Sequence, residues 1–215
     1  MQERRDENNL NNEWYTSRNP YYLNGYGLPN CTTYAWGRIS EILGEPINTC
    51  NGNAITFAYE PDFIPISEPV AGSIMVWSEG YFNCGHVAVV EHVYKDGSID
   101  ISDSSYGGYN FKITRLYPNN NYYNGDSTLS FEGFFLHKKI EEQLEMEKEQ
   151  EKVKTNKFIK ESILEVHPSL ENFINNSTTM PGLENGFLIG AICMQNKKKS
   201  FRRLLSRIGG KYGIN

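Results

Sequence analysis

Residues 25–38 have the sequence GYGLPNCTTYAWGR, and a helix is expected to begin in the middle of them. Asn30 is a favourable N-cap residue because its short side chain can accept hydrogen bonds from the first turn of a helix. The positions that follow have the spacing of one apolar helical face: Cys31, Ala35, Ile39 and Ile42. The sequence therefore predicts a helix that begins at Cys31 and ends near Gly44.

A cysteine in the first turn of a helix has a chemical consequence. The N–H groups and the partial positive charge of a helix N-terminus favour a thiolate over a thiol, and the thiolate is the nucleophile. The same N–H groups can hold an oxyanion, and a nearby histidine can act as base and acid. The alternative is that Cys31 is a small buried hydrophobic residue and that His86 is a strand-edge histidine bonded to a backbone carbonyl.

Four apolar runs predict strands: residues 70–77, 86–93, 98–103 and 131–137. Lys95-Asp96-Gly97 is typical of a hairpin turn between the second and third of these runs. His86 starts the second run directly after Gly85, where a loop can expose its side chain. Glu91 alternates away from His86, so we expect it to be a solvated strand residue.

Six segments occur in a fixed order that resembles the CHAP family, the cysteine- and histidine-dependent amidohydrolases/peptidases. They are GYGLPNCTTYAWGR, GNA at 52–54, PVAGSIMVW, GHVAVVEHV, DGSIDISDSSY and FEGFFLHK. The resemblance covers about residues 13–138. It implies a papain-like α+β fold in which N-terminal helices, one carrying Cys31, pack on an antiparallel sheet carrying His86.

The resemblance also implies a cysteine-dependent thiol hydrolase that cleaves peptidoglycan. The bond would be the amide between sugar and stem peptide, as in an N-acetylmuramoyl-L-alanine amidase, or one inside the cross-bridge, as in an endopeptidase. No cofactor is implied for bond breaking. Some family members bind structural calcium through aspartates that flank the cysteine, but NPYYLNGYGLPNCTTYAW contains no aspartate. We therefore expect no metal site.

A third catalytic group is expected at Asp103, where family members commonly have Glu, and Ser105 stands at a possible fourth position where Asn is usual. Asp103 shares a strand face with Ile99 and Ile101. A four-residue hairpin turn would place Asp103 opposite His86, whereas a two-residue turn would place it opposite Val90 and make Ser105 the nearer partner. Strand alternation thus supports the pairing, and turn length decides it.

Other residues are weaker candidates. Asn30, Trp36, Trp77 and Tyr106 are candidates for a substrate groove, although core packing is the stronger interpretation of the two tryptophans. Cys84, two residues before His86, is a candidate second thiol whose alternative is a bystander.

Composition divides the chain into four parts. Residues 1–12 are polar and are expected to form a flexible arm, and 13–138 the catalytic domain. Residues 139–168 alternate acidic and basic side chains and predict a solvated helix. Residues 169–215 form a tail of unassigned function whose segment Lys197–Lys211 carries seven basic residues and no acidic ones.

Charge and hydropathy narrow the classes of partner. The net charge of −5 gives no reason to expect a nucleic-acid partner. The N-terminal residues include no apolar run, so we expect no signal peptide, and Gly186–Met194 is too short for a transmembrane span.

Two hypotheses follow from different classes of protein. The first is a bacteriophage or bacterial peptidoglycan hydrolase, either an endolysin released from the host cytoplasm through a holin or a lysin carried on the virion tail. The second is a virion or envelope adaptor whose CHAP-like domain binds the cell wall without cutting it. In the adaptor and in a virion-borne lysin, residues 139–215 are expected to contact phage tail or virion proteins.

Overall fold

The computed structural model describes residues 2–49, 52–80 and 83–166. The chain divides into two compact units, residues 1–143 and 144–215. The first unit contains the sheet and all the helices that pack on it. The tail expected at 169–215 and two of the four cysteines, Cys50 and Cys193, lie outside the described residues.

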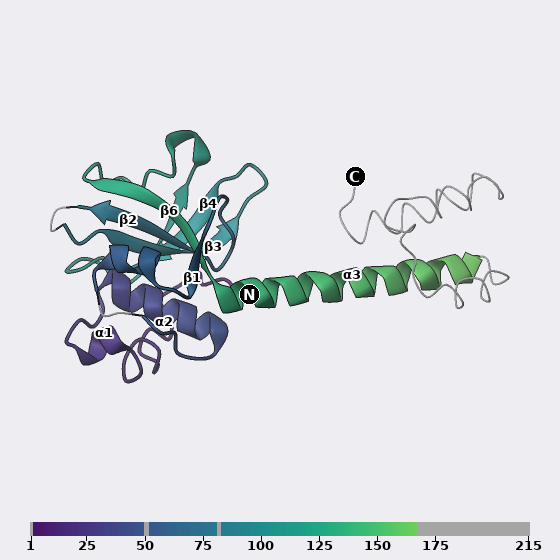
Figure 1. Ribbon diagram of the computed structural model, residues 1–215, viewed down its shortest axis with the longest axis horizontal. Helices are drawn as coiled ribbons and strands as arrows, with labels where there is room; N and C mark the ends of the chain where they lie inside the picture. The colour runs from purple at the N-terminus through teal and green to yellow at the C-terminus, as the bar shows by residue number, and fades with distance from the viewer. Residues whose placement is uncertain (1, 50–51, 81–82, 167–215) are drawn as a thin grey trace. The chain divides into compact units, whose positions relative to one another are not determined.

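The first unit is built on a six-stranded antiparallel sheet with the order β1-β6-β2-β3-β4-β5 (Figure 1). Its strands are β1 (Phe63–Ile66), β2 (Ile74–Glu79), β3 (His86–Val93), β4 (Ile99–Asp103), β5 (Lys112–Leu116) and β6 (Leu129–His137). Strands β2 to β5 follow one another as hairpins, and β6 returns to pair between β1 and β2. The candidate residues on β3 and β4 therefore lie on neighbouring strands.

Two helices precede the sheet in the chain, α1 (Pro20–Leu23) and α2 (Cys31–Leu43), and α2 packs against β3. A 3-10 helix, η1 (Ala54–Tyr59), follows them, and a second, η2 (Pro118–Asn120), follows β5. Helix α2 begins at Cys31 and is capped by Gly44 in a left-handed conformation, as predicted. The expected α+β class, with N-terminal helices packed on an antiparallel sheet, is confirmed.

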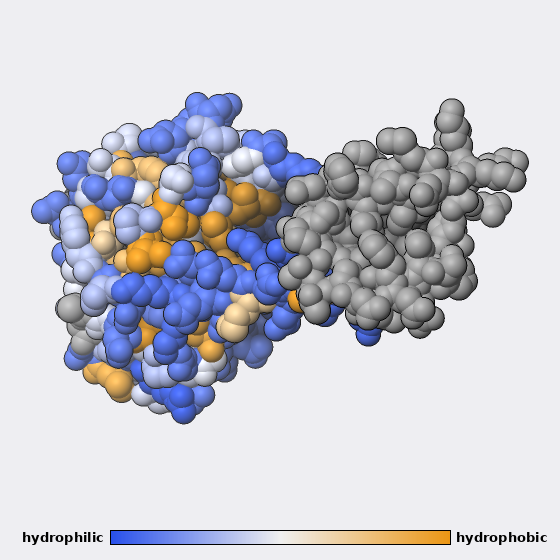
Figure 2. Space-filling model, turned by 45° about the vertical axis from the view of Figure 1, so that its right-hand side comes forward, coloured by the Kyte–Doolittle hydropathy of each residue, from blue (hydrophilic) through white to orange (hydrophobic). Residues whose placement is uncertain are grey.

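The sheet is buried on both faces. One cluster of buried side chains comes from alternating positions of β2, β3 and β4, among them Trp77, Ala88, Val90 and Ile101. The intervening positions, such as Val76 and Val89, are also fully buried. Figure 2 shows that one side of the molecule still carries a band of apolar surface between polar regions. Burial on both faces explains why β2 and β3 contain continuous apolar runs in the sequence.

The observed strands differ from the predicted ones at several points. Strand β2 begins at Ile74 rather than residue 70, because the N–H of Ser73 donates to the carbonyl of Val70 in a turn. Strands β1 and β5 were not predicted. Their exposed and buried positions follow no clear alternation, so periodicity gives no strong signal there.

The N-terminal residues do not have the character expected of a flexible arm. The Arg4 side chain is buried, and its guanidinium forms an ion pair with Glu41 of α2. Farther along, Tyr15 crosses α2 at Gly37, where an added Cβ would lie 2.5 Å from the Tyr15 ring. This segment is therefore part of the packed unit.

Helix α3 (Lys138–Val166) carries the predicted run of alternating charges. Ile140, near its start, is buried in the first unit. Most of its described residues beyond Gln143 are exposed, as a solvated helix requires. In the described residues no helix is both long and apolar enough to cross a membrane.

Candidate active site

Cys31 is the first residue of α2, and its position is fixed by the cap that precedes it. The side-chain oxygen of Asn30 accepts hydrogen bonds from the N–H groups of Thr32 and Thr33, at 2.9 and 3.1 Å. Asn19, which caps α1, donates to the carbonyl of Thr33 at 3.0 Å and ties the two helices together. Cys31 remains partly exposed at the N-terminus of α2, the end of the helix that carries partial positive charge.

His86 is the first residue of β3, and the backbone around it is tightly constrained. Gly85 has a φ of +70°, and an added Cβ would lie 2.2 Å from the carbonyl oxygen of Trp77. No other residue type fits there without a backbone shift. The ring of Trp77 packs on the His86 ring, and the Cys84 carbonyl accepts from the N–H of Ala54. The loop before His86 is thus anchored to both β2 and η1.

The structure brings Cys31, His86 and Asp103 together. The Nε2 atom of His86 lies 2.8 Å from Oδ2 of Asp103, at the end of β4. The Cys31 thiol lies beside the His86 ring, close enough to raise the pKa of His86, and both side chains line one groove. Since Asp103 occupies Nε2, Nδ1 is the nitrogen left to face the thiol. A nucleophile, a base and a carboxylate that orients the base are therefore connected in series.

The surroundings of His86 favour its charged form. Burial acts to lower the pKa of His86, but the hydrogen bonds to Asp103 and Cys31, together with their negative charges, raise it to about 10. His86 therefore holds a proton at neutral pH. An imidazolium beside a cysteine is the state that stabilises a thiolate.

The register between β3 and β4 matches neither of the two predicted turns. Tyr94 donates its N–H to the carbonyl of Ser98, which closes a three-residue loop. A bulge between Val90 and His92 then shifts the register, so that Val89 pairs with Ser102. Asp103 therefore lies two residues diagonal to His86 on the same face. The prediction that Asp103 and His86 share one face of the sheet is right, and their side chains meet across the diagonal between the two strands.

The loop after β4 supplies contacts that the sequence did not suggest. The hydroxyl of Tyr109 donates to the same Oδ2 of Asp103 at 2.7 Å. Ser104 is fully buried; its hydroxyl accepts from the Asn30 N–H at 2.9 Å and donates to the Tyr109 carbonyl. This loop thereby links the carboxylate to the cap of α2. Ser105, the expected fourth residue, lines the adjoining groove instead.

A groove with a volume of about 860 Å³ opens beside Cys31 and His86. Asn30, Ser105 and Tyr106 line it, and Cys84 does so as well. Tyr26, which was not predicted, joins Tyr106 as an exposed aromatic residue of the lining. Exposed tyrosines beside amide side chains suit a polar polymer, because the ring stacks while polar atoms hydrogen-bond.

Two of the candidate groove residues lie elsewhere. Trp36 and Trp77 are buried, and the indole N–H of Trp36 donates to the carbonyl of Ile47. Trp77 acts on the site only through its contact with the His86 ring. Both tryptophans therefore belong to the core, the stronger of the two interpretations given above.

The groove lining also has a charge. It includes two carboxylates, Glu79 and Asp126, and no Lys or Arg among the lining residues that the structure describes. Such a groove favours neutral or cationic groups of a substrate over anionic ones. No group of three or more His, Cys, Asp or Glu side chains in the described ranges is placed to hold a metal ion.

Comparison with known proteins finds similarity to one domain family. Residues 21–105 match the model of the CHAP domain. The probable autolysin LDP of Staphylococcus aureus is 36% identical over 104 residues, which cover 47% of this chain and 36% of that protein. The staphylococcal secretory antigen SsaA of the same species is 33% identical over 93 residues, 43% of this chain and 34% of the antigen. The chain thus spans about a third of the length of these relatives.

Two solved structures resemble a part of this chain. An N-acetylmuramoyl-L-alanine amidase from Staphylococcus aureus is 30% identical, with a TM-score of 0.35 and coverage of 41% of this chain and 27% of that one. The protein Ly7917 is 18% identical, with a TM-score of 0.36 and coverage of 52% and 55%. The match to the family model includes both Cys31 and His86 and extends to Ser105. Residues 21–105, which include Cys31, His86 and Asp103, are therefore similar to a CHAP domain.

Proposed function

We propose that this chain is a peptidoglycan hydrolase that cleaves an amide bond with Cys31 as the nucleophile. The observation that carries the proposal is the series of contacts from Cys31 to His86 to Asp103 at the start of α2. The CHAP domain and the relatives named as an autolysin and an amidase support the choice of substrate. The groove of exposed tyrosines and amides beside Cys31 suits a glycopeptide polymer.

The first chemical step is acylation. The Cys31 thiolate attacks the carbonyl carbon of the amide, and the carbonyl oxygen becomes an oxyanion. Asn30 already occupies the N–H groups of Thr32 and Thr33, so the Cys31 N–H is the first-turn donor to which the oxyanion is assigned. Protonated His86 then gives its proton to the leaving nitrogen, the C–N bond breaks, and a thioester remains on Cys31.

The second step is hydrolysis of that thioester. His86, now neutral, takes a proton from a water molecule that attacks the carbonyl carbon, and the thiolate leaves. The negative charge of Asp103 stabilises the imidazolium that forms again. The sum of the two steps is one water molecule consumed and one amide bond converted to a carboxylic acid and an amine.

The test is digestion of purified cell walls followed by mass spectrometry of the released fragments. Wild-type protein is expected to clear the walls and to release fragments with a single new kind of terminus. A free lactyl carboxylate on muramic acid would identify an amidase, and a new amino terminus within the peptide would identify an endopeptidase. Cys31→Ala is expected to abolish release, while Cys84→Ala, which alters the other thiol of the groove, is the matched control.

Two outcomes would contradict the proposal. Wall fragments released at an undiminished rate by Cys31→Ala would rule out covalent catalysis by this residue. Protein that binds walls but leaves every bond intact would instead favour the adaptor hypothesis. Binding and release are therefore measured on the same wall preparation.

A further inference from the structure

Glu91 on β3 is a buried carboxylate outside the catalytic series. Its side chain is fully buried, contrary to the expectation that it is solvated. It sits within the β3 bulge, between Val90 and His92, where the register to β4 shifts. A buried carboxylate is stable only if cations and hydrogen-bond donors surround it. The origin of those donors shows what Glu91 connects.

All the donors to Glu91 come from other elements. Arg38 of α2 donates from Nε to Oε1 and from an Nη atom to Oε2, both at 2.8 Å. The hydroxyl of Ser102 on β4 donates to Oε1 at 2.7 Å. The backbone N–H of Arg4 donates to Oε2 at 2.8 Å. Each carboxylate oxygen thus accepts two hydrogen bonds.

The elements that meet at Glu91 are those that carry the catalytic series. Helix α2 begins with Cys31 and carries Arg38, and β3 begins with His86 and carries Glu91 itself. Ser102 and Asp103 are neighbours on β4, so their side chains point to opposite faces of the sheet. One face of β4 therefore holds His86 through Asp103, and the other holds Glu91 through Ser102.

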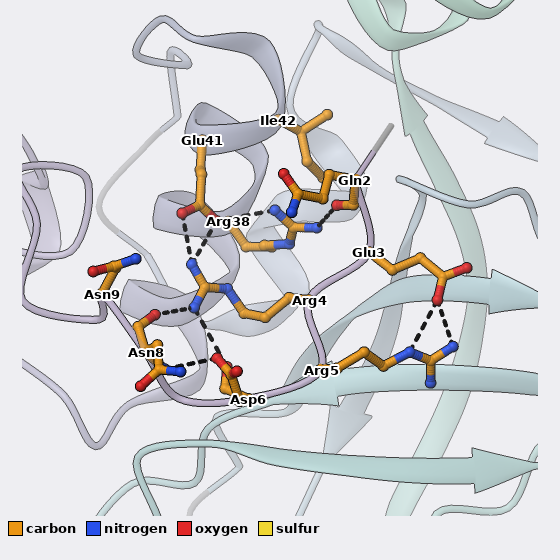
Figure 3. Close-up of a pocket in the computed structure, with 10 residues that line it drawn as sticks. All are labelled: Gln2, Glu3, Arg4, Arg5, Asp6, Asn8, Asn9, Arg38, Glu41 and Ile42. Atoms are coloured by element: carbon orange, nitrogen blue, oxygen red, sulfur yellow. Dashed lines mark hydrogen bonds and ion pairs between the residues drawn. The ribbon is translucent and has the colours of Figure 1, made fainter.

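The N-terminal segment closes this network from outside. Figure 3 shows Arg4 and Arg38 directed toward Glu41, with the Gln2 carbonyl bonded to Arg38. Arg38 donates to Gln2 at 2.6 Å and to Glu41 at 2.9 Å, and Arg4 binds Glu41 through one nitrogen at 2.6 and 2.7 Å. The fork of Arg38 on Glu91 is thus held by a bond from Nη1 to Glu41 and by a second bond from the Nη2 atom that also donates to Glu91. A planar, multiply bonded guanidinium fixes a geometry that a lysine cannot.

We infer that Glu91 is a positioning residue for the catalytic series, because it sets the placement of α2 and β4 relative to β3. Only the expected change in kcat rests on the proposed function. A displacement of about 1 Å between reacting groups can lower turnover by about a hundredfold. Loss of the Glu91 charge is therefore expected to reduce kcat and the reactivity of Cys31 and to change KM much less, since the groove residues outside α2, β3 and β4 stay in place.

The test compares Glu91→Gln with Leu136→Val, a core substitution on β6 whose residue pairs with β1, away from the network. Thermal unfolding, kcat and KM per folded molecule, and the alkylation rate of Cys31 are measured for both. For Glu91→Gln, kcat and alkylation are expected to fall at least about tenfold. In Leu136→Val both rates are expected to stay within about twofold, because that substitution leaves the hydrogen bonds of Glu91 intact.

A second variant keeps the test decisive if Glu91→Gln does not fold. In Arg38→Met/Glu91→Met, apolar side chains replace the buried pair, a change that folds are known to tolerate. We expect this variant to fold and still to show reduced kcat and slow alkylation of Cys31. Wild-type alkylation and kcat in a folded Glu91→Gln or in the double variant would overturn the inference. Because alkylation needs no cell wall, its rate tests the positioning role of Glu91 even if wild-type protein cleaves no peptidoglycan.

Discussion

Helix α2 and strands β3 and β4 carry two clusters of polar residues that are organised in opposite ways. Cys31, His86 and Asp103 border an open groove, and one buried oxygen of Asp103 has no hydrogen-bond partner within the described residues. Glu91 and Arg38 are closed off from the groove, and both oxygens of Glu91 accept two hydrogen bonds each.

The difference teaches how one set of elements can serve both chemistry and rigidity. A buried carboxylate with both oxygens fully bonded holds the elements that donate to it in one arrangement. A cluster with bonding capacity left over can respond when charge moves during a reaction. Changes in the catalytic cluster should therefore affect turnover far more than folding, whereas changes in the Glu91 network should affect both.

The largest effect is expected for His86→Ala. This change removes both the proton donor to the leaving group and the cation beside Cys31, so turnover should fall by about a thousandfold or more. Wall clearing per folded molecule measures it, with His92→Ala as the control because His92 pairs with Glu3 away from the groove. A larger loss of turnover in His92→Ala than in His86→Ala would mean that His92, at the other end of β3, is the base. The contrast between the two polar clusters would then be wrong.

The second largest effect on turnover is expected from a comparison of Asp103 and Ser105, the two residues considered as partners of His86. Asp103→Asn keeps the shape but loses the charge that stabilises the imidazolium, so turnover should fall by about a hundredfold or more. Ser105→Ala should stay within about twofold, since Ser105 only lines the groove. Turnover and thermal stability are measured for both. An Asp103→Asn variant that loses stability but keeps its turnover would make Asp103 merely structural.

The site also shows how much of its structure can be predicted from the sequence. Asn30, Cys31 and Gly44 are local signals, and they were enough to place α2 correctly. Strand alternation gave the correct face for Asp103, but its register depends on a bulge at Glu91. That bulge accompanies contacts with Arg38, which is 53 residues away in the sequence. No local pattern encodes such a contact, and an acidic residue at an alternate strand position suggests solvent.

Tyr109 was missed for a related reason. It lies in the loop after β4, where neither helical nor strand periodicity applies, and only the path of that loop brings its hydroxyl to Asp103. Tyr26 likewise reaches the groove through the loop before α2. By contrast, burial of Trp36 and Trp77 could be expected from their residue type alone.

A titration of His86 sharpens the account of charge at the open cluster. Its pKa in the folded protein is raised to about 10, above the ordinary value of about 6.5. A raised pKa means that folding favours the protonated form, so this contribution to stability is complete below about pH 6.5 and is lost as the pH rises toward 10. Nuclear magnetic resonance of the His86 ring should show no titration near pH 6.5. Asp103→Asn should move the titration to lower pH, and an unmoved midpoint would contradict the role of Asp103.

The smallest effect is expected for Tyr109→Phe. The ring and its packing remain, but Asp103 loses one of the two donors to Oδ2, so the carboxylate is held less firmly behind His86. Turnover should fall by several fold, about the effect of one hydrogen bond of roughly 1 kcal/mol. Steady-state kinetics on cell walls, with Tyr123→Phe as a control on the exposed surface, measures the change. Equal turnover in the two variants would show that the bond to Tyr109 does not matter.

The most direct test of the central claim compares two thiols that line the same groove. Cys31 lies at the start of α2 beside His86, whereas Cys84 is exposed in the loop before β3. Limited iodoacetamide treatment at pH 7, followed by peptide mass spectrometry, gives the alkylation rate of each. The account predicts faster alkylation of Cys31 despite its lower exposure, parallel loss of wall cleavage, and loss of the difference in His86→Ala. Equal rates in wild-type protein, or cleavage that survives complete alkylation of Cys31, would contradict it.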